Sequence, residues 1–98
     1  MPKKYPTLKL SEVKSILESL RFTLKHKVGS HSQWEHEKDA NHPRSVVTLD
    51  EAEREFDAYL IKSMIEQSNR SRDEFYGATK KTAKRASVPH LKRLEVDE

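Results

Sequence analysis

The chain has 98 residues, of which 36% are charged and 34% hydrophobic, so it is long enough for one domain with a modest core. It contains no cysteine, which excludes a disulfide-stabilised scaffold and any cysteine-ligated metal site. The net charge of +3 is a mild indication of an anionic partner, and no apolar run reaches the length of a secretory signal or a membrane span, so we expect a cytoplasmic protein without a membrane partner.

The first periodic segment predicts a helix over residues 12–19. Ser11 is a suitable N-cap residue, and Glu12 lies in the first turn, where the helix dipole favours a negative charge. Apolar residues recur on one face at helical spacing: Val13, Ile16, Leu17 and Leu20. Residues 1–8, which contain two prolines and two lysines, are expected to form a flexible N-terminus.

Three short segments with alternating character, residues 22–27, 32–36 and 44–49, predict an antiparallel three-stranded sheet. Gly29 and Ser30 predict a tight turn between the first two strands, because glycine adopts positive φ without steric cost. Trp34 is a natural core residue, so His31, three residues before it at the start of the strand, faces outward. The other residues expected to face the core are Phe22, Leu24, Ser32, His36, Val47 and Leu49.

Residues 50–67 predict a long second helix with a buried stripe made by Phe56, Leu60, Ile61, Met64 and Ile65. Acidic residues at its start suit the positive end of the helix dipole, and Asn69 tolerates the left-handed conformation found at many helix C-termini. Ser71 and Glu74 match a capping box that begins a short helix. A further helix is expected at the basic residues Lys80, Lys81, Lys84 and Arg85.

These elements predict an α+β fold with the order helix, three antiparallel strands, helix and short helix (α-β-β-β-α), followed by a basic tail. The two main helices are expected to cover one face of the sheet and to leave the other face open. The open face then includes Lys25, Lys27, His31, Gln33 and Thr48. It is polar and partly basic, and it carries a histidine, whose charge changes near neutral pH.

The order of these motifs resembles the HicA toxin family. The matching residues are Gly29-Ser30-His31 with Trp34, Val47-Thr48-Leu49, and Gln67-Ser68-Asn69-Arg70-Ser71 leading into Glu74-Phe75. The resemblance implies a fold like that of double-stranded-RNA-binding domains over residues 9–77, preceded by the flexible residues 1–8 and followed by a basic extension over residues 78–98. It also implies an mRNA endoribonuclease of a type II toxin–antitoxin system, neutralised by a HicB-type antitoxin.

The resemblance further implies that His31 is the catalytic residue and that neither a metal nor a cofactor is required. A histidine can take the proton from the RNA 2′-hydroxyl or protonate the leaving oxygen. Lys25 and Lys27 are expected to hold the phosphate. The other expected RNA contacts are Ser30, Ser32, Lys80, Lys81 and Lys84. One histidine supplies half of an acid–base pair, so we expect a slow enzyme.

Several alternatives stay open at this stage. His31 can also be interpreted as a turn histidine that makes a structural hydrogen bond. Residues 80–85 can also be interpreted as a solvated helix face or as an antitoxin-binding arm. Residues 50–55 are mostly acidic, whereas family members typically carry basic residues there. The alternative functions are a non-catalytic RNA-binding module and a protein-interaction module on the same fold. We expect a monomer or a weak homodimer.

Overall fold

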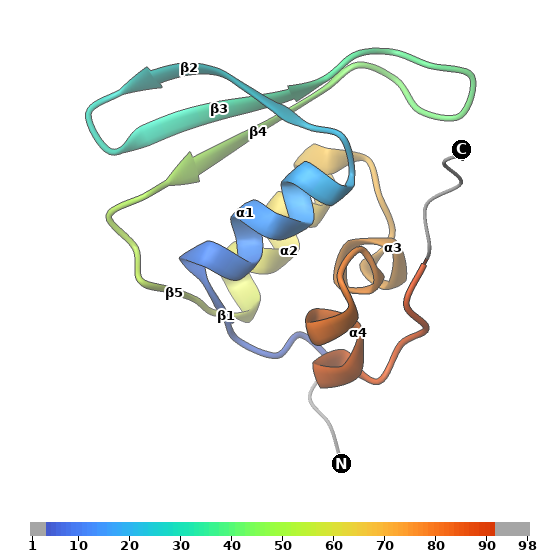
Figure 1. Ribbon diagram of the computed structural model, residues 1–98. Coiled ribbons are helices and arrows are strands. Elements are labelled where there is room, and N and C mark those ends of the chain that lie inside the picture. Colours follow the sequence, from blue (N-terminus) through green and yellow to red (C-terminus); the bar gives the residue numbers. More distant parts are fainter. Residues whose placement is uncertain (1–3, 92–98) are drawn as a thin grey trace.

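The computed structural model describes residues 4–91, in which helices cover one face of a three-stranded sheet and the other face is open (Figure 1). The elements are β1 (Leu8–Lys9), α1 (Leu10–Ser19), β2 (Thr23–Val28), β3 (His31–His36), β4 (Ser45–Asp50), β5 (Glu55–Phe56), α2 (Ala58–Ser68), α3 (Arg72–Gly77) and α4 (Lys80–Ala86). The predicted α+β fold is confirmed. Residues 1–3 of the predicted flexible N-terminus and residues 92–98 of the predicted basic tail lie outside the described residues.

The main sheet is an antiparallel meander in the order β2-β3-β4. Gly29, with a φ of 59°, makes the turn between β2 and β3, as the sequence predicted. The pairing of β2 with β3 is irregular, because Leu24 lies opposite Trp34 whereas His26 lies opposite Gln33. Lys25 is therefore the extra residue of a β-bulge, and side chains after it point to the opposite face from the one that simple alternation predicts.

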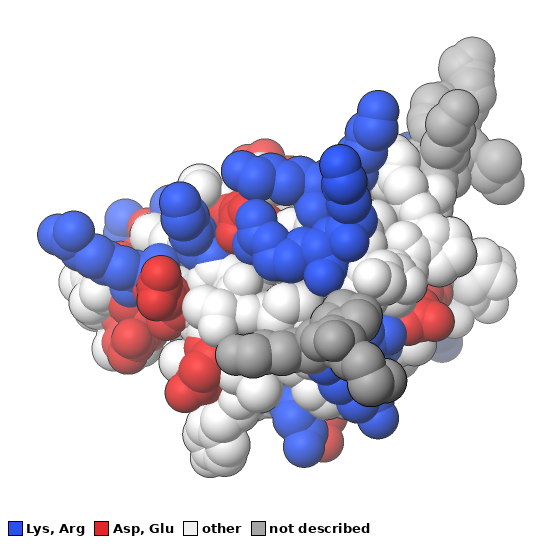
Figure 2. Space-filling view, turned by 90° about the horizontal axis from the view of Figure 1, so that it is seen from below, with Lys and Arg blue, Asp and Glu red and all other residues white. Residues whose placement is uncertain are grey.

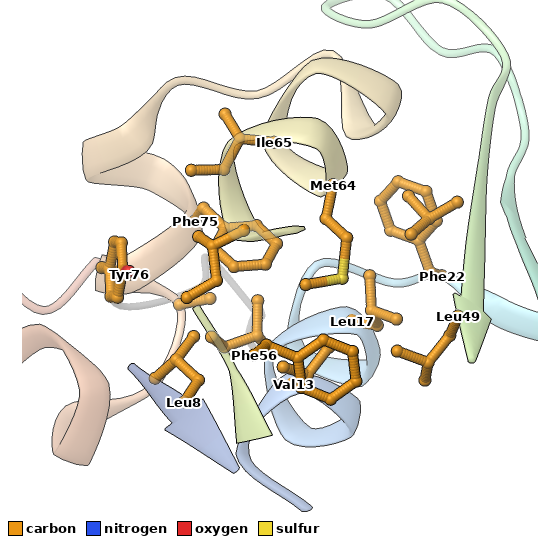
Figure 3. Close-up of a cluster of buried hydrophobic side chains, with 14 of the residues drawn as sticks. Leu8, Val13, Leu17, Phe22, Leu49, Phe56, Met64, Ile65, Phe75 and Tyr76 are labelled. Carbon is orange, nitrogen blue, oxygen red and sulfur yellow. The ribbon is translucent and has the colours of Figure 1, made fainter. Parts of the chain in front are cut away.

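The core lies between the sheet and the helices α1, α2 and α3, whose side chains converge in Figure 3. Trp34 faces this core, as predicted, and its indole Nε1–H donates to Ser32 Oγ over 3.0 Å. The fully buried apolar side chains include Leu8, Val13, Ile16, Leu17, Val47, Ile61, Phe75 and Tyr76. Burial of these side chains is the main source of stability for a chain with no disulfide.

Two apolar residues differ from the sequence prediction. Leu24, which was expected in the core, is 48% exposed. Leu8 belongs to the segment expected to be flexible, yet it is fully buried, because β1 pairs with β5 and places Leu8 opposite Phe56. The pairing joins two segments that are far apart in the sequence.

The predicted helix over residues 50–67 is wrong over its first part. Strand β4 continues to Asp50, a turn follows, and Phe56 lies in β5 rather than in a helix. Helix α2 begins after Asp57, whose side chain accepts a hydrogen bond of 3.0 Å from Leu60 N–H. Most of the acidic residues at 50–57 therefore lie in the connection between β4 and α2 and do not interact with a helix dipole.

Residues close in sequence determine where the other helices begin and end. Asn69 ends α2 in the left-handed conformation, and Ser71 and Glu74 form the predicted capping box of α3. The predicted N-cap of the first helix, Ser11, is wrong. Lys9 occupies that position, because the Glu12 carboxylate accepts a hydrogen bond of 2.9 Å from Lys9 N–H.

Helices α3 and α4 are joined to the beginning of the described chain by polar contacts. The Arg85 guanidinium on α4 donates to both carboxylate oxygens of Glu12 on α1. Tyr76 on α3 donates its hydroxyl proton to the carbonyl oxygen of Pro6 over 2.7 Å. These contacts place the predicted helix at residues 80–85 against the rest of the fold, and α4 confirms that helix.

Candidate functional site

His31 lies at the start of β3 on the open face of the sheet, beside the Gly29 turn. Its side chain is 64% exposed, and its Nε2 lies 3.9 Å from Asp50 Oδ2. The register of β3 and β4 places Asp50 directly opposite His31. The imidazole is therefore accessible to a ligand and has a carboxylate as its neighbour.

A small hollow of about 170 Å³ lies beside His31, where the end of the sheet meets α2. Its lining includes Thr48 and Asp50 from β4 and Ser63 and Gln67 from α2. Gln67 Oε1 accepts a hydrogen bond of 3.1 Å from Thr48 N–H, which fixes β4 against α2. Sites for whole small molecules measure about 300–1,000 Å³, so this hollow suits one group of an extended ligand.

The Asp50 carboxylate is anchored by the turn that follows it. Its Oδ1 accepts a hydrogen bond of 3.0 Å from Ala52 N–H. This bond and a hydrogen bond from the Ser30 hydroxyl hold the pKa of Asp50 below its usual value. The carboxylate is therefore ionised at neutral pH. Ser30, a predicted RNA contact, is partly exposed, but its hydroxyl already donates a hydrogen bond to this carboxylate.

The prediction that Lys27 shares a face with His31 is wrong. Lys27 lies opposite Ser32, a position on the helix-covered face, because of the bulge at Lys25. Its Nζ lies 3.3 Å from Glu51 Oε1, which also binds Lys14 at 2.9 Å.

Glu51 is therefore neutralised within the fold, and the hydrogen bond from Lys14 is the main cause that lowers its pKa to about 2. Lys25 is exposed at the bulge. The β2 residues that share the open face with His31 are His26 and Val28, which sequence reasoning did not assign to it.

Ser32 does not contact solvent, so it is not available to bind RNA as predicted. Its side chain is fully buried, and its hydroxyl oxygen accepts the Trp34 indole hydrogen bond and lies 3.4 Å from the Leu49 carbonyl oxygen. The hydroxyl therefore satisfies the one polar atom of the buried Trp34 side chain.

The lysines of α4 form a separate basic surface. Lys80, Lys81 and Lys84 are exposed, and Figure 2 shows basic side chains gathered on the face where α4 lies. In Figure 1, α4 and the turn between β2 and β3 lie on opposite sides of the molecule. The structure therefore does not bring these lysines together with His31, and a ligand must be extended to reach both.

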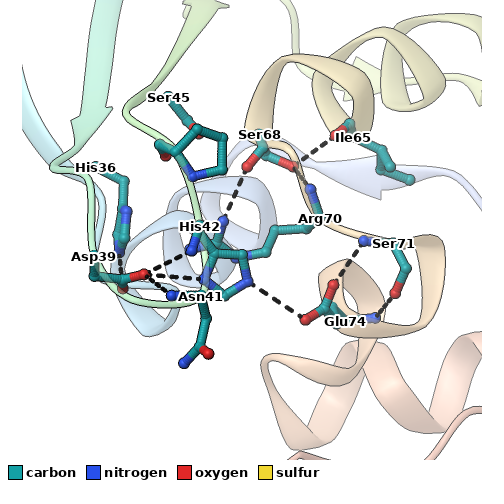
Figure 4. Close-up of polar contacts among 11 residues, drawn as sticks. His36, Asp39, Asn41, His42, Ser45, Ile65, Ser68, Arg70, Ser71 and Glu74 are labelled. Carbon is teal, nitrogen blue, oxygen red and sulfur yellow. Dashed lines mark hydrogen bonds and ion pairs between the residues drawn. The ribbon is translucent and has the colours of Figure 1, made fainter.

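A second polar cluster joins the loop between β3 and β4 to α3 (Figure 4). His42 lies between two carboxylates, with Nδ1 3.6 Å from Asp39 Oδ1 and Nε2 3.8 Å from Glu74 Oε2. Asp39 Oδ1 also accepts the backbone N–H groups of Asn41 and His42 over 2.8 and 2.7 Å. The carboxylates are thus occupied by contacts that order the loop.

His36 and Arg70 are the buried members of this region, which borders a cavity of about 460 Å³. Burial lowers the pKa of His36, and the nearby Arg70 charge adds to the effect. Within residues 4–91, no group of three or more His, Cys, Asp or Glu side chains is placed to hold a metal ion.

A protein-family model described as HicA toxin of bacterial toxin-antitoxin matches residues 10–69, which is more than half of the chain. The matched range runs from α1 through α2, contains His31 and Asp50, and excludes α3 and α4. No curated protein and no solved structure matches the chain. Among the described residues, no helix has the length and apolar character needed to cross a membrane.

Proposed function

Because the chain belongs to the HicA toxin family of bacterial toxin-antitoxin systems, we propose that it cleaves mRNA with His31 as the group that transfers protons. The observation that carries the proposal is the exposed imidazole at the edge of a small hollow, within the matched range and beside an ionised carboxylate. The proposed partners are mRNA and a HicB-type antitoxin, and the proposed compartment is the cytoplasm, where mRNA is translated.

The proposed reaction uses the RNA itself as the nucleophile. The 2′-hydroxyl attacks the adjacent phosphorus, the bond from phosphorus to the 5′-oxygen breaks, and the products are a cyclic phosphate and a 5′-hydroxyl. Such a reaction needs proton transfer at the two oxygens, which a histidine performs near neutral pH.

RNA binding in this proposal relies on charges that remain exposed in the fold. Lys25 lies at the bulge of β2, on the same hairpin as His31, and Ser30 lies in the adjoining turn. Lys80, Lys81 and Lys84 provide a second positive surface for the phosphate backbone of an extended strand. Lys27 is paired with Glu51 and contributes less than the sequence suggested.

The decisive experiment incubates the purified protein and its His31→Ala variant with a long single-stranded RNA in EDTA. We expect cleavage by the parent and at least about a hundredfold slower cleavage by the variant. His26→Ala is the matched control, since His26 is also exposed on the open face but lies on β2. His26→Ala should cleave at the parental rate, and thermal unfolding should show that all three proteins are folded.

Other results would support the alternative functions. RNA that is shifted on a gel but cleaved by none of the proteins would indicate a non-catalytic RNA-binding module. Absence of both binding and cleavage would indicate a protein-interaction module. Equal cleavage by the parent and His31→Ala would exclude His31 as the proton-transfer group.

A further inference from the structure

Asp50 faces His31 with one of its two carboxylate oxygens. Its Oδ1 is held by Ala52 N–H, whereas its Oδ2 points to His31 Nε2 at 3.9 Å. The two residues are a direct cross-strand pair, so the backbone of β3 and β4 fixes the separation of their Cα atoms. A hydrogen bond requires about 3.2 Å or less, so the contact proposed below needs a small rotation of the exposed imidazole towards Asp50.

We propose that Asp50 is a positioning residue that accepts the Nε2–H of His31 and leaves Nδ1 as the atom that takes the proton from RNA. This inference rests on the proposed ribonuclease function. A carboxylate beside one ring nitrogen selects the tautomer that carries the proton on that nitrogen and stabilises the imidazolium that forms. Catalytic hydrogen bonds are often long without substrate and shorten when it binds.

This pair assists the attack of the RNA 2′-oxygen on phosphorus. The RNA 2′-oxygen gives its proton to Nδ1 of His31 and forms a bond to phosphorus. The bond between phosphorus and the 5′-oxygen breaks, and water supplies the proton for the leaving oxygen. The imidazolium then carries protons on both nitrogens, and the Asp50 carboxylate offsets its charge. Asp50 itself keeps no proton.

Asp50→Asn tests the inference because it changes the charge and keeps the shape. The amide oxygen still accepts Ala52 N–H, so the NH₂ group replaces Oδ2 and presents a donor to His31 Nε2. This donor favours the tautomer with the proton on Nδ1, which cannot accept a proton from RNA. We expect kcat to fall about tenfold or more while KM changes less than about twofold.

The ¹⁵N chemical shifts of the histidine ring provide a readout that does not depend on cleavage. At pH 8, we expect the parent to show His31 with the proton on Nε2 and Asp50→Asn to show it on Nδ1. Glu66→Gln is the control, because Glu66 is exposed on α2, does not line the hollow and is not paired with His31. It should change neither the tautomer nor kcat, and Asp50→Glu should recover part of the lost kcat.

The possible results separate the two proposals. An unchanged tautomer in Asp50→Asn overturns the positioning role, whatever the parent does to RNA. A changed tautomer with an unchanged kcat also overturns it, because the contact then has no effect on catalysis. Absence of cleavage by the parent, with a changed tautomer in Asp50→Asn, overturns the proposed ribonuclease function and leaves the contact between the two residues established.

Discussion

Arg85 on α4 binds Glu12 on α1 through two hydrogen bonds, of 2.7 Å to Oε1 and 2.5 Å to Oε2, across 73 residues of sequence. The Glu12 carboxylate is buried, with 6% of its side chain exposed, and it also accepts Lys9 N–H. Removal of its charge leaves the Arg85 guanidinium partly buried without its counter-ion. The pair therefore joins the matched family domain to a helix outside it.

We predict that Glu12→Gln lowers the free energy of unfolding by about 1–3 kcal/mol, as measured by urea denaturation. The range extends down to about 1 kcal/mol because the Arg85 side chain is 33% exposed, and water therefore weakens its attraction to Glu12. Lys81→Ala is the control, because Lys81 is 73% exposed and lies 3.6 Å from the same carboxylate. Its effect should stay below about 0.5 kcal/mol. Equal effects of the two substitutions would contradict the prediction.

Acid should unfold the protein partly through Glu12. The hydrogen bond from Arg85, followed by the one from Lys9 N–H, lowers the pKa of Glu12 from 4.5 to about 2. A folded-state pKa below the unfolded value means that the unfolded state binds more protons in this range. The contribution of Glu12 is thus complete above pH 4.5 and is lost as the pH falls through 2. Glu12→Gln should flatten the stability profile between these values, and an unchanged slope would argue against the pair.

We predict a second loss of stability on acidification, caused by His36 and occurring at a higher pH than the loss caused by Glu12. Its pKa lies below the ordinary 6.5 chiefly because of burial, and its Nδ1 is buried without a hydrogen-bond partner. The unfolded state therefore takes up a proton first as the pH falls below 6.5, so folding stability decreases from there.

The test compares urea unfolding at pH 8 and pH 5.5. His36→Phe, whose ring would lie beside Phe22, should remove this part of the pH dependence, and the exposed His26→Gln should retain it. Loss of the dependence in both variants would assign it to another group.

Gly77 is predicted to be intolerant of a side chain for steric reasons. A Cβ at this position would lie 2.6 Å from the Pro89 carbonyl oxygen. We expect Gly77→Ala to lower the free energy of unfolding by about 1–3 kcal/mol through displacement of the chain after α4. This loss should occur although alanine favours helices.

Gly29 provides the contrast, because a Cβ there meets nothing within 4 Å but φ is +59°. Gly29→Ala should cost about 1 kcal/mol from backbone strain alone, and Gly29→Asn should cost less. Thermal unfolding of the three variants measures both effects. A harmless Gly77→Ala would show that the chain near Pro89 moves freely.

The lysines of α4 should contribute to RNA affinity and not to chemistry. Simultaneous substitution of Lys80, Lys81 and Lys84 by alanine should weaken RNA binding and reduce the magnitude of its salt dependence by about 0.7 per lost phosphate contact. At saturating RNA, kcat should be unchanged, because α4 and the His31 turn lie on opposite sides of the molecule. An unchanged salt dependence would favour the alternatives of a solvated helix face or an antitoxin-binding arm.

Local sequence was sufficient for most elements of the fold. Alternation identified β3 and β4, and the inward position of Trp34 correctly predicted the outward position of His31. Asn69 and the capping box at Ser71 correctly predicted the boundary between α2 and α3. These features depend on interactions within a few residues, which is why a single sequence reveals them.

The errors arose where distant residues determine the conformation. The pairing of Leu8 with Phe56 has no local signal, and without it residues 50–56 resemble the start of a helix. The bulge at Lys25 places Lys27 on the opposite face from the one that simple alternation predicts. Asp50 was assigned to a helix, so its position opposite His31 was missed. Extending the third strand by one residue would have revealed that pair.

The separation of Arg85 from Glu12 also has a consequence for synthesis of the protein on the ribosome. The carboxylate emerges from the exit tunnel long before the guanidinium that binds it, since the two residues are 73 positions apart in the sequence. Until then, α1 lacks its contact with α4, and Glu12 is a charged group without this partner. The packing of α4 on α1 is therefore completed only once residue 85 has left the tunnel, after His31 and its hairpin have already been made.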